Sequence, residues 1–312
     1  MQRSTVQLGQ YPPARQVIAH LSEPHFLAGG APLHGAAATV DNLRQALLQL
    51  ERSDHLISAL VFTGDLTDLG ESDAYERLRD LVEPFANRMG AQLIWVMGNH
   101  DERPEYSRVL LHEDPSDEPQ DRVYDLDGLR LIVLDTSVPG YHHGDLTDAQ
   151  LDWLRNELRT PAPNGTLLAL HHPPIPIILE VMATLELLDQ HRLEEVVRGT
   201  DVRGILGGHL HYPTSSMFAG VPVSVAPASC YALSLTAKDR LLSGLNGGQA
   251  FNLVHVYDDR IVHSVVPIGE FAEISSLGAE ALPGILAMTP EERREQLSAK
   301  RAPANLGDEP GD

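Results

Sequence analysis

Short apolar runs rich in β-branched residues alternate along the chain with longer stretches in which apolar residues recur every three to four positions. The runs have the length of buried strands, and the longer stretches have the periodicity of amphipathic helices. Their alternation predicts βαβ units and a largely parallel sheet. The strands that we expect in this part of the chain are residues 16–22, 59–64, 92–98, 129–135, 166–170 and 204–207.

The expected helices lie between these runs. One covers residues 40–51 with Thr39 as its N-cap, and another begins after Ser72. Beyond Gly220 the pattern changes to short strands with short connections, which predicts antiparallel pairing at the end of a second sheet. Those strands are residues 221–226, 252–257 and 260–267, and the glycine-rich segment 231–249 between them is expected to be a long flexible loop.

The pattern divides the chain into a large α/β domain over residues 1–270 and a C-terminal extension over residues 271–312. In the extension, Thr289 and Glu292 form a capping box around Pro290, which predicts a short helix. The tail from about residue 303 is polar and is expected to be disordered.

Charge and composition restrict the function. With 23 Lys and Arg against 44 Asp and Glu, the net charge of −21 should repel nucleic-acid polymers and anionic lipid surfaces. A small phosphate ester can still bind where bound cations reverse the local field. Cys230 is the only cysteine, so no intramolecular disulfide can form. The first 15 residues lack an apolar signal core and no apolar run has the length of a membrane helix, so we expect a cytoplasmic protein.

Polar side chains cluster directly after the apolar strands. Because the carboxyl ends of parallel strands meet at one edge, we expect these carboxylate, imidazole and amide groups to lie together there. Alone, a Gly-Asp pair is usually a turn, and two alternating histidines are ordinary strand residues. Five such groups in order, each following an apolar run, favour a functional site built from Glu23, His25, Asp65, Asn99, His100, Asp101, His171, His172, His209 and His211.

The residue types suit a pair of hard-to-borderline cations such as Zn, Mn or Fe, because they are carboxylates and imidazoles without a thiolate. A carboxylate can bridge two cations, which together lower the pKa of a water and clamp phosphoryl oxygens. Glycine precedes Asp65, Asn99 and His209, which would let the chain turn sharply and bring the ligands close to the ions.

These motifs resemble the signature of the metallophosphoesterases, or calcineurin-like phosphoesterases: Asp-x-His, Gly-Asp, Gly-Asn-His-Asp, a later His, and Gly-His-x-His. Within that family the chain is most similar to bacterial class III cyclic-nucleotide phosphodiesterases, especially actinobacterial ones. The narrower resemblance is carried by Leu134-Asp135-Thr136, by Val138-Pro139-Gly140 and by Leu170-His171-His172-Pro173-Pro174. It covers about residues 16–268 and implies a four-layer αββα sandwich of two mixed β-sheets flanked by helices.

The resemblance also implies residue roles. Glu23, His25 and His211 would hold a first metal and Asn99, His171 and His209 a second, with Asp65 as the bridge. The metals would be Mn²⁺, Fe²⁺/Fe³⁺ or Zn²⁺. His100 would not be a ligand but would protonate the leaving oxygen, Asp68 and Asp101 would orient ligands, and His172 would support its loop. The residues expected to touch the substrate are His25, Asp65, Asn99, His100, His143 and His209.

One position departs from the family pattern, because Glu23 stands where the family has Asp. Its extra methylene is expected to weaken the first metal site. The function that we expect is hydrolysis of 3′,5′-cyclic nucleotides to 5′-monophosphates. Two alternatives remain open: the same chemistry on 2′,3′-cyclic nucleotides, glycerophosphodiesters or phosphomonoesters, or a metal- or nucleotide-binding module whose site has lost activity through Glu23. A homodimer also remains open.

Overall fold

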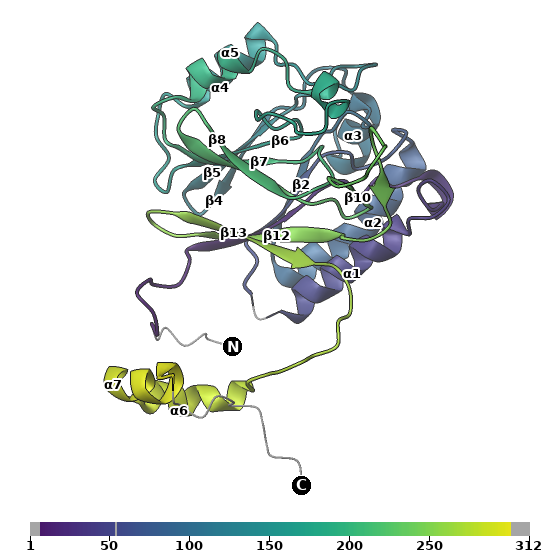
Figure 1. Cartoon of the computed structure of the whole chain (residues 1–312). Helices are drawn as coiled ribbons and strands as arrows, with labels where there is room; N and C mark the ends of the chain where they lie inside the picture. The colour runs from purple at the N-terminus through teal and green to yellow at the C-terminus, as the bar shows by residue number, and fades with distance from the viewer. Residues whose placement is uncertain (1–6, 54, 301–312) are drawn as a thin grey trace. The chain divides into compact units, whose positions relative to one another are not determined.

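The computed structural model describes residues 7–53 and 55–300 (Figure 1). The chain separates into two compact units, residues 14–269 and a smaller unit made from the two ends of the chain. The larger unit holds all the candidate site residues. In the described parts of the chain, no helix combines the length and the apolar character that crossing a membrane requires.

The first sheet has the strand order β13-β12-β1-β2-β3. Its parallel strands are β1 (Gln16–Leu21), β2 (Ala59–Thr63) and β3 (Gln92–Val96). The antiparallel strands β12 (Ala250–Val256) and β13 (Ile261–Pro267) extend it on the other side of β1. The expectation that these last strands close the second sheet was wrong, because β12 pairs with β1 and covers its open edge.

The second sheet has the order β4-β5-β6-β7-β9-β8. The predicted strands are present as β5 (Leu129–Leu134), β6 (Thr166–Leu170), β7 (Val202–Gly207) and β9 (Val221–Val225). Sequence reasoning missed the two edge strands, β4 (Arg122–Leu126) and β8 (Thr214–Phe218). Both have few buried residues and many polar ones, so they lack the continuous apolar run that marks a central strand.

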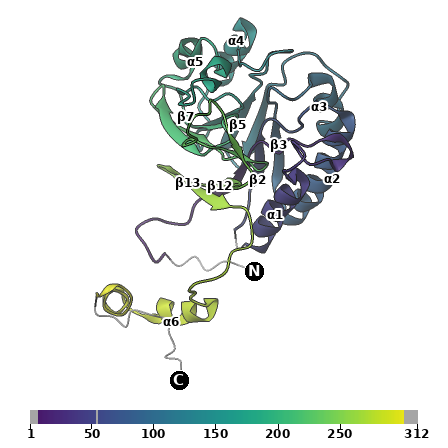
Figure 2. The same ribbon diagram turned by 45° about the vertical axis from the view of Figure 1, so that its right-hand side comes forward.

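Helices cover the outer faces of both sheets (Figure 2). The helices α1 (Thr39–Arg52), α2 (Ser72–Met89) and α3 (Arg103–Leu110) pack on the first sheet, and α4 (Asp148–Glu157) and α5 (Gln190–Val197) pack on the second. A third apolar cluster lies between the sheets. The predicted αββα sandwich is therefore confirmed.

Local differences from the predictions are small. Thr39 is the first residue of α1 rather than its N-cap, and Ala38 takes the cap position without a side-chain hydrogen bond. The expected loop 231–249 contains a short antiparallel ladder between β10 (Ala232–Leu233) and β11 (Gly244–Leu245). Single-turn 3₁₀ helices lie at Ala28–Gly30 and Met182–Leu185.

The C-terminal extension contains a 3₁₀ turn (Ala279–Ala281), α6 (Leu282–Ala287), α7 (Pro290–Arg293) and a π-helical turn (Arg294–Ser298). The predicted capping box is confirmed. The Glu292 backbone N–H donates to the Thr289 hydroxyl, and the Thr289 backbone N–H donates to the Glu292 carboxylate. The tail predicted to be disordered from residue 303 lies outside the described residues.

Candidate metal centre

The candidate ligands follow five parallel strands, β1, β2 and β3 of the first sheet and β6 and β7 of the second. Their carboxyl ends meet at one rim of the sandwich. Backbone hydrogen bonds join neighbouring strand ends, with Glu23 N–H donating to Gly64 O (3.1 Å) and Gly208 N–H donating to His171 O (3.0 Å). Two further bonds join the sheets, because Nδ1 of His171 donates to the Thr63 carbonyl at 2.8 Å and the His209 backbone N–H donates to Oε1 of Glu23 at 2.6 Å. The rim therefore brings together side chains from both sheets, as the sequence predicted.

Five of these residues have left-handed backbone conformations, although none of them is glycine. Their φ angles are 55° for Glu23, 44° for His25, 48° for Asp65, 71° for His209 and 54° for His211. Such conformations are unfavourable for residues with a Cβ and persist only where the surroundings enforce them, which is typical of functional sites. The strained turns aim successive side chains into one small volume.

Gly208 matters because a side chain at this position would collide with the loop after β1. A Cβ added there would lie 2.3 Å from the Ser22 hydroxyl oxygen and 2.7 Å from Oε1 of Glu23. Only glycine lets the loop after β7 approach the loop after β1 so closely. The prediction that glycines bring the ligands together is therefore supported, by a contact between the two sheets.

The first group of ligand atoms belongs to Glu23, His25, Asp65 and His211, which are all buried and lie within 4.8 Å of one another. Oε2 of Glu23 is 3.3 Å from Nε2 of His25 and 3.2 Å from Nε2 of His211, and Oδ2 of Asp65 is 3.4 Å from Nε2 of His25. Ligands bonded at about 2.0–2.2 Å to one cation are separated by roughly such distances. These four residues fit a metal ion.

The second group contains His171, His209 and Asn99. Nε2 of His171 is 3.0 Å from Oδ1 of Asn99 and 3.4 Å from Oδ1 of Asp65. Among the described residues, Nε2 of His209 is buried and has no hydrogen-bond partner. A buried imidazole nitrogen without a partner is costly unless something coordinates it. Burial and the neighbouring His171 lower the pKa of His209 to about 3, so its ring is neutral and suited to ligation.

Asp65 lies between the two groups. One of its oxygens faces His25 of the first group and the other faces His171 of the second. Burial opposes ionisation of Asp65, but His171, His25 and His100 outweigh it and hold its pKa well below the ordinary value. Burial and Asp65 also oppose ionisation of Glu23, yet His171, His211 and His25 lower its pKa to about 2. Both carboxylates are therefore ionised at neutral pH.

The carboxylates keep protons on nearby histidines. Burial opposes the charge on His171, but Asp65 and Glu23 raise its pKa to about 9. Burial likewise opposes the charge on His25, and hydrogen bonds to Asp68 and Glu23 raise its pKa well above the ordinary value. Metal ligation requires neutral imidazoles, so a binding cation displaces these protons.

Asp68 and Asp101 make the contacts that their predicted orienting role requires. Oδ1 of Asp68 accepts Nδ1–H of His25 at 3.0 Å, which leaves Nε2 of that ring for a metal. The carboxylate of Asp101 ties together the loops after β2 and β3, because it accepts hydrogen bonds from the backbone N–H groups of Leu66, Thr67 and Gly98 and from the Tyr75 hydroxyl.

His100 lies beside the first ligand group and is less buried than its members. Its backbone N–H donates to Oδ1 of Asp65 at 2.9 Å, and Nδ1 of its ring donates to the Asp68 carbonyl at 2.8 Å. The side chain is 30% exposed, whereas the ligand histidines are buried, and its ring lies edge-on to that of His25 with centroids 4.8 Å apart. His100 thus stands at the mouth of the site.

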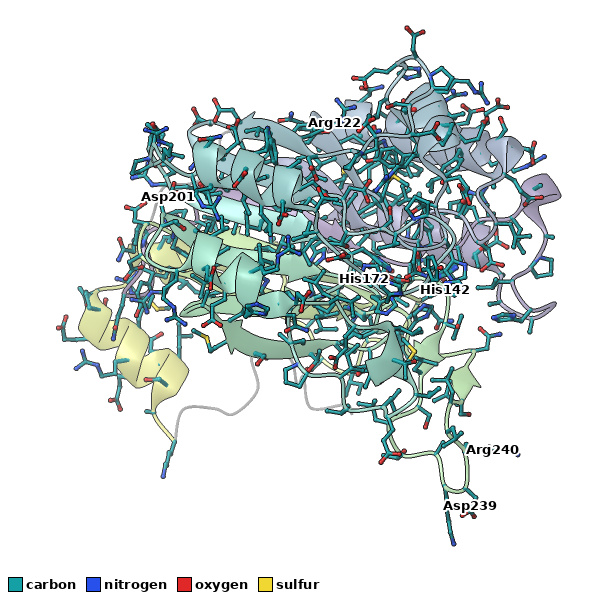
Figure 3. The ribbon with its side chains drawn as sticks, turned by 90° about the horizontal axis from the view of Figure 1, so that it is seen from above. Arg122, His142, His172, Asp201, Asp239 and Arg240 are labelled. Carbon is teal, nitrogen blue, oxygen red and sulfur yellow. The ribbon has the colours of Figure 1, made fainter. Side chains whose placement is uncertain are left out.

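Sequence reasoning missed His142. Nδ2 of Asn99 donates to Nδ1 of His142 at 2.9 Å, and this turns the Asn99 oxygen toward His171. Figure 3 shows His142 beside His172, whose Nε2 donates to the His142 carbonyl. The neighbouring His143 packs its ring against Tyr141, and its predicted contact with phosphate stays a prediction. The tandem histidines give no signal in the sequence for which ring faces Asn99.

His172 is close enough to the second group to be mistaken for a ligand. Both of its ring nitrogens have partners, because Nδ1 lies 2.8 Å from the Thr136 hydroxyl and Nε2 bonds the His142 carbonyl. It therefore supports the loop, as expected from the sequence.

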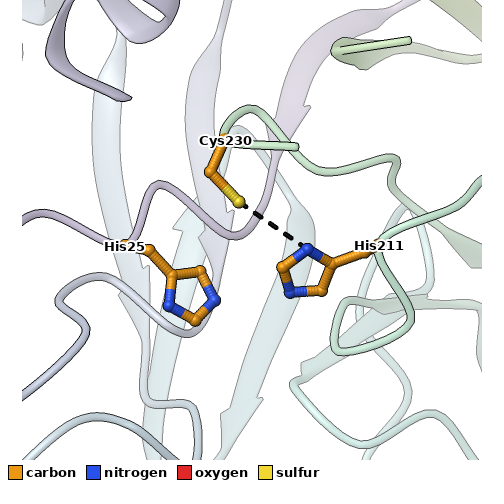
Figure 4. A group of neighbouring side chains, drawn as sticks. All are labelled: His25, His211 and Cys230. Atoms are coloured by element: carbon orange, nitrogen blue, oxygen red, sulfur yellow. Dashed lines mark hydrogen bonds between the residues drawn. The ribbon is translucent and has the colours of Figure 1, made fainter. Parts of the chain in front are cut away.

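Cys230 lies beside the first group (Figure 4). Its Sγ is 3.6 Å from Nδ1 of His211, and it packs with Leu33, Ala37 and Ala228. Burial raises the pKa of the thiol to about 12, so it is protonated. The residue belongs to the core, and its closeness to His211 was not predicted from the sequence.

An αββα sandwich that carries two adjoining ligand groups at one rim has the features of a dinuclear metallohydrolase. Residues 17–213 match the family model for calcineurin-like phosphoesterases, and the chain belongs to that family. It is 55% identical over 83% of its length to the cAMP/cGMP dual specificity phosphodiesterase of Mycobacterium tuberculosis, of which it covers 82%. It is 29% identical over 79% of its length to a 3′,5′-cyclic adenosine monophosphate phosphodiesterase of Pseudomonas aeruginosa, of which it covers 87%.

A solved structure supports the fold independently. The dimetal phosphatase from Danio rerio superposes with a TM-score of 0.59 and 16% sequence identity, covering 82% of this chain and 98% of that one. At this identity the likeness shows the shared fold alone.

Proposed function

We propose that this protein is a dinuclear metal-dependent phosphodiesterase that hydrolyses 3′,5′-cyclic AMP and cyclic GMP to the 5′-monophosphates. The observation that carries the proposal is the position of Asp65, whose two carboxylate oxygens each lie 3.4 Å from a histidine of a different ligand group. A carboxylate in that position can bridge two cations. The names of the relatives in Mycobacterium tuberculosis and Pseudomonas aeruginosa supply the substrate class.

The ligand set of the first cation is Glu23, His25, His211 and Asp65, and that of the second is Asn99, His171, His209 and Asp65. Carboxylates, imidazoles and an amide favour Mn²⁺, Fe²⁺/Fe³⁺ or Zn²⁺. When bound, such a pair supplies an activated water and withdraws charge from the phosphoryl oxygens.

His100 is suited to act as the general acid. Because its Nδ1–H donates to the Asp68 carbonyl, the ring orientation is fixed, and a second proton can only reside on Nε2. From the mouth of the site, Nε2–H can protonate the departing ribose oxygen as the P–O bond breaks. Asn99, held by His142, keeps its oxygen toward His171.

A cavity of about 310 Å³ supports a nucleoside as part of the substrate. It adjoins the first ligand group through Tyr231, whose ring lies with its centroid 4.5 Å from that of His211. Its walls are mainly apolar, which suits a planar heterocycle. The lining includes Leu33, His34, Tyr231, Leu242, Leu245 and Asn246.

The test is a product assay with metal-free protein reconstituted with Mn²⁺. The protein should convert 3′,5′-cyclic AMP and cyclic GMP to 5′-AMP and 5′-GMP, with an Asp65→Ala protein as the inactive control. Turnover of 2′,3′-cyclic nucleotides or glycerophosphodiesters without any turnover of the 3′,5′-cyclic compounds would overturn the substrate assignment. Tight binding of two Mn²⁺ ions without turnover of any phosphodiester would overturn the enzymatic function.

A further inference from the structure

The two oxygens of the Glu23 carboxylate have different surroundings. Oε2 faces Nε2 of His25 and Nε2 of His211, at 3.3 and 3.2 Å. Oε1 instead accepts two protein hydrogen bonds, from the Ser22 hydroxyl at 2.8 Å and from the His209 backbone N–H at 2.6 Å. These two donors fix the rotation of the carboxylate and leave one oxygen for a cation.

The Ser22 hydroxyl is the end of a buried chain of side chains. The Thr63 hydroxyl donates to Ser22 Oγ at 2.9 Å, and Nε2 of His20 lies 3.0 Å from Thr63 Oγ1. All four residues, including Glu23, are fully buried. Ser22 and Thr63 also approach carbonyl oxygens, but at 3.2 Å or more. The shorter contact to a charged acceptor is the stronger one, so the Ser22 proton points at Glu23.

The protonation of His20 determines which way the hydrogen bonds point. Burial lowers the pKa of His20 to about 3, so the ring is neutral and carries one proton. Within residues 7–53 and 55–300, Nδ1 of His20 has no hydrogen-bond partner, whereas Nε2 lies beside Thr63, which favours the Nε2–H tautomer. Each hydroxyl then accepts from one neighbour and donates to the next, and every proton points toward the carboxylate. Aligned hydrogen bonds of this kind polarise one another.

The hydrogen-bonded residues His20 and Thr63 lie between the two sheets, where polar residues are unusual. Ile18 of β1 and Val61 of β2 belong to the apolar cluster between the sheets. His20 and Thr63 follow them by two residues and so lie on the same inner faces, nearer the rim. Buried polar groups are usually hydrogen-bonded, and here Nε2 of His20 and the hydroxyl groups of Thr63 and Ser22 all have partners. Through Ser22, these buried polar residues lead to a hydrogen bond with the Glu23 carboxylate at the rim.

We propose that His20, Thr63 and Ser22 are positioning residues that, together with the His209 backbone N–H, hold the Glu23 carboxylate so that Oε2 alone ligates the first cation. The inference rests on the proposed function for the presence of that cation. It explains how a glutamate can serve where the family has an aspartate: the longer side chain spans the distance from the Ser22 and His209 donors to the metal position. Without the donors, the extra rotatable bond would leave the carboxylate free to turn.

The experiment is a calorimetric titration of Mn²⁺ into the metal-free full-length protein. Ser22→Ala should weaken the first site by about 10- to 100-fold, as expected for loss of a residue that orients a ligand, and leave the second site unchanged. Thr63→Val removes the next hydroxyl and should weaken the first site by a smaller factor of roughly 3–10. Thr63→Ser keeps that hydroxyl and should restore the parental affinity.

Ser107→Ala is the matched control, because Ser107 is a buried serine of α3 whose hydroxyl donates to the Arg103 carbonyl. Its Mn²⁺ affinities should equal the parental ones. Thermal unfolding of each metal-free variant shows whether it is folded. Parental first-site affinity in Ser22→Ala would overturn the proposal, and so would equal weakening of both sites. If the parent binds two Mn²⁺ ions and the variants behave as stated, but cyclic nucleotides are not hydrolysed, the proposed function fails and the positioning chain stands.

Discussion

The backbone N–H of His100 donates to Oδ1 of Asp65 over 2.9 Å. This bond joins the candidate acid, in the loop after β3, to the candidate bridge, in the loop after β2. Asp65 also faces a histidine of each ligand group, so one carboxylate contacts both groups and the backbone of His100. Changes at these two residues should therefore have separable effects on metal content and on turnover.

Asp65→Ala removes the carboxylate whose two oxygens each face Nε2 of a histidine in a different ligand group. Two cations a few ångströms apart would then repel each other without a shared anion between them. We expect loss of at least one ion and a loss of turnover of more than about 10³-fold. Metal analysis of the purified variant checks this. Retention of two tightly bound ions would show that Asp65 does not bridge.

His100→Ala should leave the metal content intact, because its Nδ1 is engaged by the Asp68 carbonyl and its ring lies outside both ligand groups. Turnover of cyclic AMP should fall by roughly 10²–10⁴-fold, the usual contribution of a general acid. The loss should be much smaller for an aryl phosphodiester with a nitrophenolate leaving group, which departs without a proton. Equal losses on both substrates would exclude the acid role.

His142 and His143 provide a matched pair of neighbouring histidines. His142 accepts the side-chain N–H of Asn99, whereas His143 packs against Tyr141. His142→Ala should release Asn99 and weaken the second metal site by about 10- to 100-fold, the usual cost of losing an orienting partner. His143→Ala should leave metal affinity unchanged and raise KM if its ring contacts the phosphate. Titrations of both variants with Mn²⁺ distinguish these effects, and parental affinity in His142→Ala would contradict the positioning role.

Metal affinity should depend on pH. In the metal-free protein His171 has a pKa of about 9 and that of His25 is raised, while Glu23 and Asp65 are already ionised at neutral pH. A cation must therefore displace protons from histidine, not from the carboxylates, and its apparent affinity should fall as the pH decreases below about 9. Calorimetry at pH 7 in buffers of different ionisation enthalpy should detect release of about two to three protons, because the pKa of His211 is also raised. Binding without proton release would contradict the assigned protonation.

The sequence predicted the α/β fold and the gathering of polar residues at one rim because both depend on local signals. Apolar runs mark the central strands, and ligand residues follow them directly, so the topology of a parallel sheet brings Asp65, Asn99 and His171 to one rim. The edge strands β4 and β8 were not predicted because their exposed, polar sequences resemble loops. The pairing of β12 with β1 is a contact between residues more than 200 positions apart, which no local pattern encodes.

The supporting residues were harder to predict for a physical reason. His142 and Ser22 act through single hydrogen bonds whose direction depends on side-chain rotamers and on neighbours from distant strands. His20 is a fully buried residue of β1. Its contact with Thr63 joins β1 to β2 across 43 positions of sequence, and only the folded sheet brings the two side chains together.

Glu23→Asp tests how the departure from the family pattern is accommodated. From the sequence alone, an aspartate at this position is expected to bind the first metal more tightly. The geometry reverses that expectation, because Oε1 is held by Ser22 and His209 while Oε2 faces His25 and His211. A side chain shorter by one C–C bond, about 1.5 Å, cannot keep both sets of contacts without moving the backbone. Pro24 restricts such movement, since it fixes its own φ and limits the residue before it.

We therefore expect Glu23→Asp to weaken the first site by about 10-fold and Glu23→Ala to weaken it by more than about 100-fold, because the first change misplaces a ligand and the second removes it. The second site, built from Asn99, His171 and His209, should keep its affinity in both variants. Activity and Mn²⁺ binding should be titrated for the parent and both variants in one buffer. Tighter first-site binding in the Asp variant would show that the hydrogen bonds from Ser22 and His209 to Oε1 do not position the carboxylate. Parental binding in the Ala variant would show that His25, Asp65 and His211 hold the first metal without Glu23.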